Sequence, residues 1–465
     1  MSKKNRLSQF TMLTALSLAT FTMAGAFTLP AAKAESLEQA LIAAYESNPT
    51  LRAARANLRA GDEAVPQALS GWRPLVTVNA NTGGQYTDSD SGSSKNSDGT
   101  LPIGASLDIV QPLYTGGRTD ANVNAAENDI QAQRSSLKST EQQVLLDAVA
   151  AYINVWRANS VLELNLNNER VLQRQLEATR DRFSVGELTR TDVAQAESRL
   201  ARAVSDRIEA EGALAEAAAV YEEVIGRSPS DTVQPPLPMS LPASLQSAVD
   251  VALASNPDVV AAEFQQRAAG HRVEAAEAEF EPEVNLVGRV SHDRNRTVDD
   301  SNTTQASVLA ELTVPIYQQG FVSSQVRQQK QISNQRRIEI EQARRRAQQE
   351  AVASWEALVT ARAQTTSFES EVEANRIALD GVQQENLVGA RTVLDVLDAE
   401  QELLNSQVNL VTAQRDLVLA AYRTIAATGS MTAQGLALDV TLYDPQANYN
   451  AVRHRAYGTD VLPIQ

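Results

Sequence analysis

An internal repeat constrains this chain more than any other feature of its sequence. Residues 36–49 begin Ser-Leu-Glu-Gln-Ala and end Ser-Asn-Pro, and they recur 208 positions later as residues 244–257, with Ser-Leu-Gln-Ser-Ala and Ser-Asn-Pro. Beyond one loop the offset becomes 203, where Pro-Leu-Tyr at 112–114 matches Pro-Ile-Tyr at 315–317. Self-similarity over such a period indicates a chain built from two copies of one structural unit.

The repeat divides the chain into segments. They are a targeting segment (1–34), a first structural repeat (35–227), a proline-rich linker (228–243), a second structural repeat (244–429) and a carboxy-terminal tail (430–465). The linker contains five prolines and is expected to be extended. The tail has no helical periodicity, so we expect it to pack as an equatorial collar or to be partly disordered.

The first 34 residues have the features of a secretory signal peptide. A basic start with Lys3, Lys4 and Arg6 precedes an apolar run, and Ala-Lys-Ala at 32–34 forms a small-x-small cleavage site. The alternative is a membrane anchor, for which the run is short and interrupted by Thr and Ser. Cleavage would remove four basic residues and no acidic one, so the formal net charge would change from −16 to −20. A chain this acidic is not expected to bind nucleic acid.

Cysteine is absent and histidine is scarce, and both are common in catalytic and metal sites. The chain has no cysteine, which excludes disulfides, thiol chemistry and a lipid-modified cysteine. The three histidines, at 271, 292 and 454, are scattered, and neither a glycine-rich phosphate loop nor a His-Glu-x-x-His motif occurs. We therefore expect no enzymatic activity, no cofactor and no metal site.

Each repeat contains one exceptionally long helical stretch. Residues 118–185 and 321–380 contain neither glycine nor proline. At 1.5 Å per residue the first run gives a helix of roughly 100 Å, a length typical of coiled coils and helical barrels. Mostly small apolar residues form a narrow stripe on the second run, at Ala343, Ala347, Ala351, Trp355 and Leu358. Such helices are expected to pack side by side.

A tight turn is expected after each long helix. Gly186 and Gly389 stand where a helix ends in a left-handed residue. Thr189-x-x-Asp192 and Thr392-x-x-Asp395 then match a capping box, with Asp in place of the commoner Glu. Each repeat is thus predicted to form an antiparallel hairpin, with a second helix of about 35 residues.

The strands are expected at 74–112 and 282–315, where apolar and polar residues alternate. This period of two is the weak signature of a membrane β-strand, and its alternative is a soluble hairpin with two different faces. Its presence in both repeats favours the membrane. The loops at 88–99 and 293–304 are expected at solvent-exposed tips. Four strands per chain cannot close a barrel, and open edges are not tolerated in lipid, so at least three chains are expected to form a pore.

The second turn carries a family resemblance. Residues 388–399 read Val-Gly-Ala-Arg-Thr-Val-Leu-Asp-Val-Leu-Asp-Ala, which resembles the turn of the TolC family of outer-membrane factors. The resemblance implies an α+β membrane protein, a homotrimer with a 12-stranded β-barrel and long coiled-coil hairpins that form an α-barrel in the periplasm. It implies a passive, gated exit duct of a tripartite efflux or type I secretion system in the Gram-negative outer membrane. The implied partners are outer-membrane lipid, a periplasmic adaptor (membrane fusion protein) and an inner-membrane transporter of the RND or ABC type.

The same resemblance assigns roles at the turns. Asp395 and Asp398 would form rings of carboxylates at the constriction, and Arg391 would latch the closed state through Asp192. The simpler reading of Asp192 and Asp395 is that they cap helices. Asn386 stands where the family often has Tyr. Leu and Gln occupy the places of Arg391 and Asp398 in the first repeat, so gate chemistry is expected mainly in the second.

The competing interpretation is a periplasmic adaptor or a structural coiled-coil protein of an export system. An adaptor would have β-rich modules flanking a single hairpin, whereas this sequence predicts two hairpins and two matched strand pairs.

Overall fold

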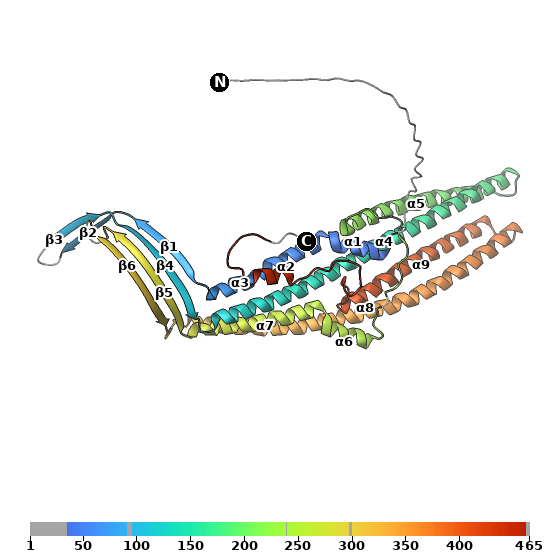
Figure 1. Cartoon of the computed structure of the whole chain (residues 1–465). Helices are drawn as coiled ribbons and strands as arrows, with labels where there is room; N and C mark the ends of the chain where they lie inside the picture. Colours follow the sequence, from blue (N-terminus) through green and yellow to red (C-terminus); the bar gives the residue numbers. More distant parts are fainter. Residues whose placement is uncertain (1–34, 91–94, 239, 297–299, 462–465) are drawn as a thin grey trace, which may run out of the picture.

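The computed structural model describes residues 35–90, 95–238, 240–296 and 300–461. The expected signal peptide at 1–34 lies outside the described residues. The molecule is elongated, with the strands at one end and the turns of two helical hairpins at the other (Figure 1). Among the described helices, none is long and apolar enough to cross a membrane.

The two halves of the chain contain similar elements in the same order, although not every element is repeated. The first half consists of α1 (Leu37–Ser47), α2 (Pro49–Asp62), α3 (Ala64–Leu69), η1 (Ser70–Trp72), β1 (Leu75–Thr82), β2 (Gln85–Asp90), β3 (Lys95–Thr100), β4 (Ile103–Tyr114), α4 (Arg118–Ser184) and α5 (Arg190–Ile225). The second consists of α6 (Leu245–Ser255), α7 (Pro257–Glu277), η2 (Ala278–Phe280), β5 (Glu283–Arg294), β6 (Asn302–Thr313), α8 (Phe321–Leu387) and α9 (Val393–Ala427). The elements α3, β2 and β3 have no separate counterparts among the described elements of the second half. The tail adds α10 (Ala447–Val452).

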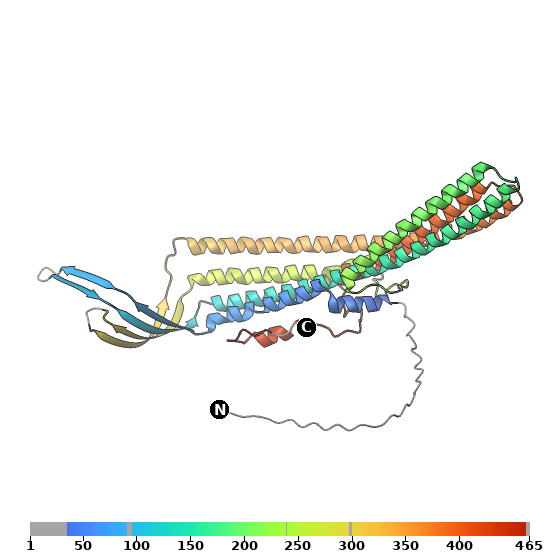
Figure 2. The same ribbon diagram turned by 90° about the horizontal axis from the view of Figure 1, so that it is seen from above.

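The long helices form as the sequence predicts. Both α4 and α8 have 67 residues, and each packs against the helix that follows its turn, α5 or α9. On α8 the expected stripe is buried at Ala347, Ala351 and Leu358 and only partly buried at Ala343 and Trp355. Figure 2 shows the two hairpins running side by side away from the sheet.

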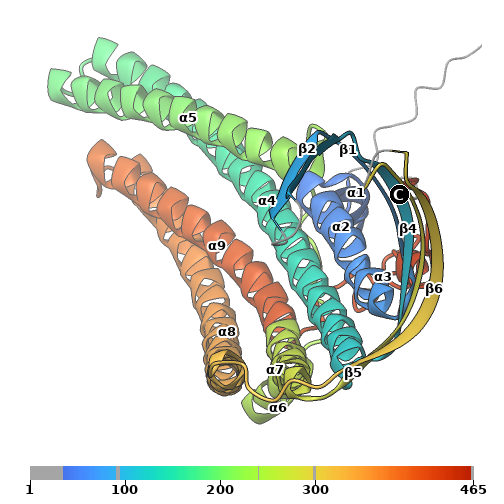
Figure 3. The same cartoon turned by 90° about the vertical axis from the view of Figure 1, so that its left-hand side faces the viewer.

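The four longest strands form one antiparallel sheet in the order β1-β4-β5-β6. The pairing of β4 with β5 joins the two halves of the chain. Val78 lies opposite Leu107, which in turn lies opposite Val290, so apolar side chains share one face. On the other face Arg289 contacts Asp108, which also accepts hydrogen bonds from Ser106 and Asn79. The predicted alternation is confirmed, and Figure 3 shows the curvature of the sheet.

The loop expected at 88–99 is in part a strand pair. Strands β2 and β3 form a separate antiparallel sheet, from Gln85 paired with Thr100 to Asp90 paired with Lys95. In the second half β5 and β6 also extend into the expected loop, to Arg294 and from Asn302. The prediction placed too much of both segments in loops. Their sequences are mostly polar and lack alternation, while the backbone hydrogen bonds that pair the strands depend little on side chains.

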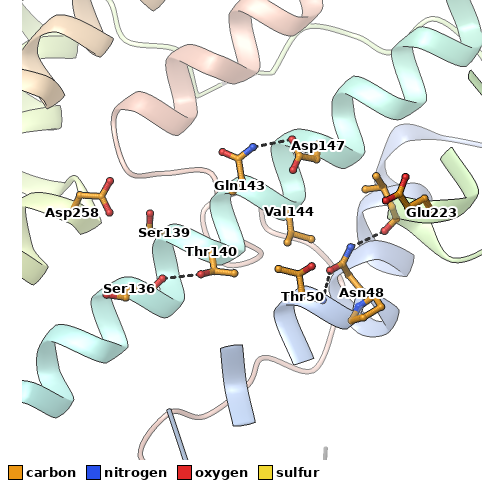
Figure 4. A pocket seen from close by; sticks show the side chains of 12 residues that line it. Asn48, Thr50, Ser136, Ser139, Thr140, Gln143, Val144, Asp147, Glu223 and Asp258 are labelled. Atoms are coloured by element: carbon orange, nitrogen blue, oxygen red, sulfur yellow. Dashed lines mark hydrogen bonds between the residues drawn. The ribbon is translucent and has the colours of Figure 1, made fainter. Parts of the chain in front are cut away.

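The repeated Ser-Asn-Pro motif joins helices end to end. Asn48 Oδ1 accepts hydrogen bonds from Thr50 N (2.9 Å) and Leu51 N (3.3 Å) at the start of α2. Its Nδ2 donates to Val224 O (2.9 Å) at the end of α5, so α2 continues where α5 stops. Figure 4 shows this joint beside a polar cavity of about 690 Å³. Asn256 repeats the arrangement with a longer bond to Ala427 O, 3.5 Å.

The main core lies near this joint, where α1, α2, α5 and the tail pack against α4. Tyr152 and Tyr221 are its largest fully buried side chains. The described part of the tail lies along α1, α2 and α4, with Met431 fully buried and Asn448 donating to Asp62 Oδ2 at 2.8 Å. The described residues of the linker form no helix or strand, and Tyr152 Oη donates to Val233 O (2.9 Å) within it.

Candidate functional site

The turns of the two hairpins lie at the end of the molecule farthest from the sheet (Figure 1). Gly186 follows α4 with φ +82°, and Gly389 follows α8 with φ +79°. In this left-handed region a Cβ is strained, so glycine is favoured. The predicted glycine turns are confirmed.

Both predicted capping boxes form. Thr189 N and Oγ1 donate to Asp192 Oδ2 at 2.8 and 2.7 Å, and Asp192 N donates back to Thr189 Oγ1 at 3.3 Å. Thr392 and Asp395 make the same three bonds at 2.8, 2.8 and 3.2 Å. The hydrogen bonds from each threonine lower the pKa of Asp192 and Asp395 below the usual range. Both carboxylates therefore close the first turn of the helix that follows.

Arg391 bridges the second turn. Its Nε donates to Glu385 Oε2 at 2.9 Å, and its carbonyl oxygen accepts a hydrogen bond from Asn386 Nδ2 at 2.9 Å. The neighbouring Glu385 carboxylate raises the pKa of Arg391. Within the described chain the structure brings Arg391 to Glu385, and it shows no ion pair between Arg391 and Asp192. Asn386 thus holds the turn through its amide, in the place where the family often has Tyr.

The first turn has an equivalent bridge with the charges exchanged. Arg182, near the end of α4, donates through Nε to Glu187 Oε2 at 3.1 Å. In the second turn the acid comes before the glycine and the base after it. Sequence reasoning missed both bridges. The available signal was a pair of opposite charges on either side of each glycine.

The two hairpins are tied together close to the turns. Arg199 on α5 forms an ion pair with Asp398 on α9, with side chains 31% and 55% exposed. The carboxylate of Asp398 is therefore engaged by the other hairpin of the same chain. No sequence pattern identified Arg199, because its partner lies 199 residues away.

An apolar contact supports this ion pair. Leu172 of α4 and Ala203 of α5 pack against Val393 and Leu397 of α9, and all four are buried. Leu397 lies directly before Asp398, so the buried side chain and the ion pair come from the same turn of helix. The two hairpins thus meet through a small buried apolar cluster and an exposed ion pair. Exposed ion pairs are directional, but each is weak and easily broken.

One further carboxyl group near the turns is partly desolvated. Gln383 Nε2 donates to Glu400 Oε1 at 3.0 Å, across the hairpin from α8 to α9. Burial is the main influence on Glu400 and raises its pKa. Its counterpart in the first hairpin, Glu197, instead pairs with Arg180 at 2.6 Å. Among the described residues, no group of three His, Cys, Asp or Glu side chains could hold a metal ion.

Comparison with known proteins agrees with this architecture. The family model described as "Outer membrane efflux protein" matches residues 40–227 and 248–430. The outer membrane efflux protein BepC of Brucella suis biovar 1 is 36% identical over 429 residues, which cover 92% of both chains. The outer membrane protein TolC of Escherichia coli K12 is 25% identical over 429 residues, covering 89% of this chain and 86% of that protein.

A solved structure matches the fold. The CmeC outer membrane channel of Campylobacter jejuni superposes with a TM-score of 0.78, over 90% of this chain and 89% of that one, at 16% sequence identity. At this identity the match concerns the fold alone. It extends over both the strand end and the hairpin end of the molecule.

Proposed function

The chain belongs to the outer membrane efflux protein family, and from this premise we propose that three copies form a gated exit duct of a tripartite efflux or type I secretion system. It is an outer-membrane transport protein of the TolC family. The duct would conduct substrates passively from the periplasm to the exterior.

The main observation that supports a trimer is the open four-stranded sheet. It ends at β1 on one side and β6 on the other, and it has one face of exposed apolar residues such as Val78 and Val308, 75% and 73% exposed. A sheet with unpaired edges is not stable in lipid, so β6 of one copy would pair with β1 of the next. Two copies would give eight strands with a filled interior, whereas three give twelve strands and leave a lumen.

The hairpins would extend the duct into the periplasm. Helices of 67 residues span roughly 100 Å, and six hairpins from three copies could form a helical barrel of that length. Its turns would meet a periplasmic adaptor and an inner-membrane transporter of the RND or ABC type. The alternative, a periplasmic adaptor or structural coiled-coil protein, is disfavoured by the family and by the four-stranded sheet.

The turns would form the gate. Because Arg391 bonds Glu385 within its own chain, a latch from Arg391 to Asp192 would have to join neighbouring copies or form after a change of rotamer. Three copies of Asp395 and Asp398 would give carboxylate rings one helical turn apart, which attract cations. The ring of Asp398 would carry its full charge once the ion pair with Arg199 is broken. We propose that the closed state is held by the Arg199–Asp398 pair and by the packing of Leu172 and Ala203 against Val393 and Leu397.

Mass and location test the proposal. The protein extracted from outer membranes in mild detergent should have a native mass of three protomers, and it should form conducting pores in planar bilayers. A mass of one or two protomers would contradict the trimer. Recovery as a soluble periplasmic monomer would instead support the adaptor alternative.

A further inference from the structure

A cavity of about 570 Å³ lies away from the hairpin turns, where α2, α4 and the tail meet the joint of the second half. Figures 1 and 2 show the tail running beside α2 and α4 at this level of the molecule. The lining includes three basic side chains and two tyrosines, namely Arg55, Arg134, Lys138, Tyr45 and Tyr443. Its size is in the range of sites for small molecules.

Arg55 is a buried arginine in the lining of this cavity. It is only 7% exposed, and its guanidinium lies between the rings of Tyr45 (4.5 Å to the centroid) and Tyr443 (5.2 Å). The backbone N of Tyr443 donates to Tyr45 Oη at 3.0 Å, which ties the tail to the Tyr45 side chain. Stacking of this kind holds a guanidinium in one plane and leaves its N–H groups directed outward.

The hydrogen-bonding capacity of Arg55 is mostly unused. Nη2 donates to Tyr45 O at 3.4 Å, which is a long and weak bond. Some side-chain nitrogens of the described chain are both shielded from solvent and without a hydrogen-bond partner, among them Arg134 Nε and Nη2. No nitrogen of Arg55 is in this condition. The remaining N–H groups of Arg55 therefore face accessible space, and this space is the cavity.

The cavity lining holds more positive than negative charge, because Arg55, Arg134 and Lys138 are accompanied by one acidic side chain, Glu141. Arg134 stacks on Tyr449 at 5.1 Å, and Lys138 lies one helical turn further along the same side of α4. The acidic side chain of the lining, Glu141, accepts a hydrogen bond from Ala433 N at 2.7 Å and so faces the tail. Burial is the main influence on the pKa of Glu141 and raises it, while the nearby positive charges of Arg55 and Lys138 lower it. The lining therefore holds three cationic side chains and one carboxyl group, which already accepts a hydrogen bond from the tail.

We propose that this cavity binds a small soluble oxyanion, a molecule carrying a phosphate or carboxylate group, through Arg55 with support from Arg134 and Lys138. Buried arginines on rigid aromatic neighbours are suited to such groups because charge-assisted hydrogen bonds are strong and directional. Arg134 lies 16 residues from the start of α4, which places it about 24 Å along the helix from the strands. A lipid headgroup at the membrane surface is too far away to be the ligand.

The proposal is tested by measuring whether inorganic phosphate or citrate binds to the full-length protein in detergent. Calorimetry at low ionic strength should detect saturable binding of inorganic phosphate or citrate. Arg55→Gln should weaken binding roughly tenfold or more, because a hydrogen bond to a charged group is lost from a buried site. Lys138→Gln should weaken it roughly two- to fivefold, because Lys138 is exposed.

Two comparisons complete the test. Lys330→Gln makes the same charge change on α8, outside the cavity, and should leave the affinity unchanged. If Arg55→Gln fails to fold, Lys138→Gln against Lys330→Gln still decides the matter, because both positions lie on exposed helix surface. Absence of saturable binding to the wild-type protein, equal affinity of the Lys138 and Lys330 variants, or binding only to vesicles of anionic phospholipid would overturn the proposal.

Discussion

Arg199 on α5 and Asp398 on α9 form an ion pair that ties the first helical hairpin to the second near their turns. The contact joins residues from the two halves of the chain, and it lies beside the buried pair Val393 and Leu397. Because both ionic partners remain partly exposed, the pair restrains the hairpins without fixing them permanently.

Arg199→Ala should favour an open duct. An exposed ion pair contributes at most about 1 kcal/mol, so the thermal unfolding midpoint should change little. The hairpins should nevertheless separate more easily, which would raise single-channel conductance in planar bilayers. Arg180→Ala is the matched control, since it removes an ion pair with Glu197 inside one hairpin. If both variants conduct like the wild type, the Arg199–Asp398 pair has no role in gating.

Arg391→Ser should also raise single-channel conductance. The arginine is the cation expected in the latch, and in this chain it bridges the turn to Glu385. Glu385→Gln separates the two roles. A rise in both variants would assign the restraint to the bridge within the turn, whereas a rise in Arg391→Ser alone would assign it to a contact with Asp192. An unchanged conductance of Arg391→Ser counts against the latch.

Replacing Asp395 and Asp398 together by Ala should abolish block of the channel by trivalent cations. A constriction lined with carboxylates binds such cations strongly, and the double variant removes both rings. The change at Asp395 also removes a helix cap, so Asp192→Ala is the control for weakened capping. That variant should retain the block. Persistent block in the double variant would show that the carboxylate rings lie elsewhere.

Acid should loosen both turns. The folded-state pKa of Asp192 and of Asp395 lies below the usual value near 3.8, so each carboxylate contributes stability above that value and loses it as pH falls through the depressed pKa. Hydrogen exchange at the turns, corrected for the intrinsic pH dependence, should therefore accelerate below about pH 4. Asp395→Asn should remove this acid response from the second turn and leave the first unchanged. A response of equal size in the variant would exclude the capping carboxylate as its cause.

Asn48→Ala should destabilise the protein more than Asn256→Ala. Both asparagines cap a helix and donate to the end of another, but the bond of Asn48 to Val224 O is 2.9 Å and that of Asn256 to Ala427 O is 3.5 Å. Loss of a cap together with a buried hydrogen bond costs roughly 1–3 kcal/mol. The difference should appear as a larger fall in the thermal unfolding midpoint for Asn48→Ala. Equal shifts would mean that the joints contribute through their caps alone.

Features that depend on local sequence were predictable. The left-handed turns at Gly186 and Gly389 and the capping boxes at Thr189 and Thr392 involve residues within a few positions of each other. The long helices were indicated by long runs without glycine or proline, although α8 continues through Gly381 to Leu387. The alternation of apolar and polar residues indicated the strands of the main sheet. The β2–β3 pair was missed because its polar sequence carries no such pattern.

The sequence by itself determined where helices start and stop, because caps and turns are satisfied by neighbours along the chain. Only the tertiary structure decided which charges meet. Asp398 is held by Arg199, a residue 199 positions away on the other hairpin. The tail likewise closes one wall of the cavity around Arg55. Ion pairs between distant residues depend on how the helices pack side by side. The spacing of residues along the chain does not predict that packing.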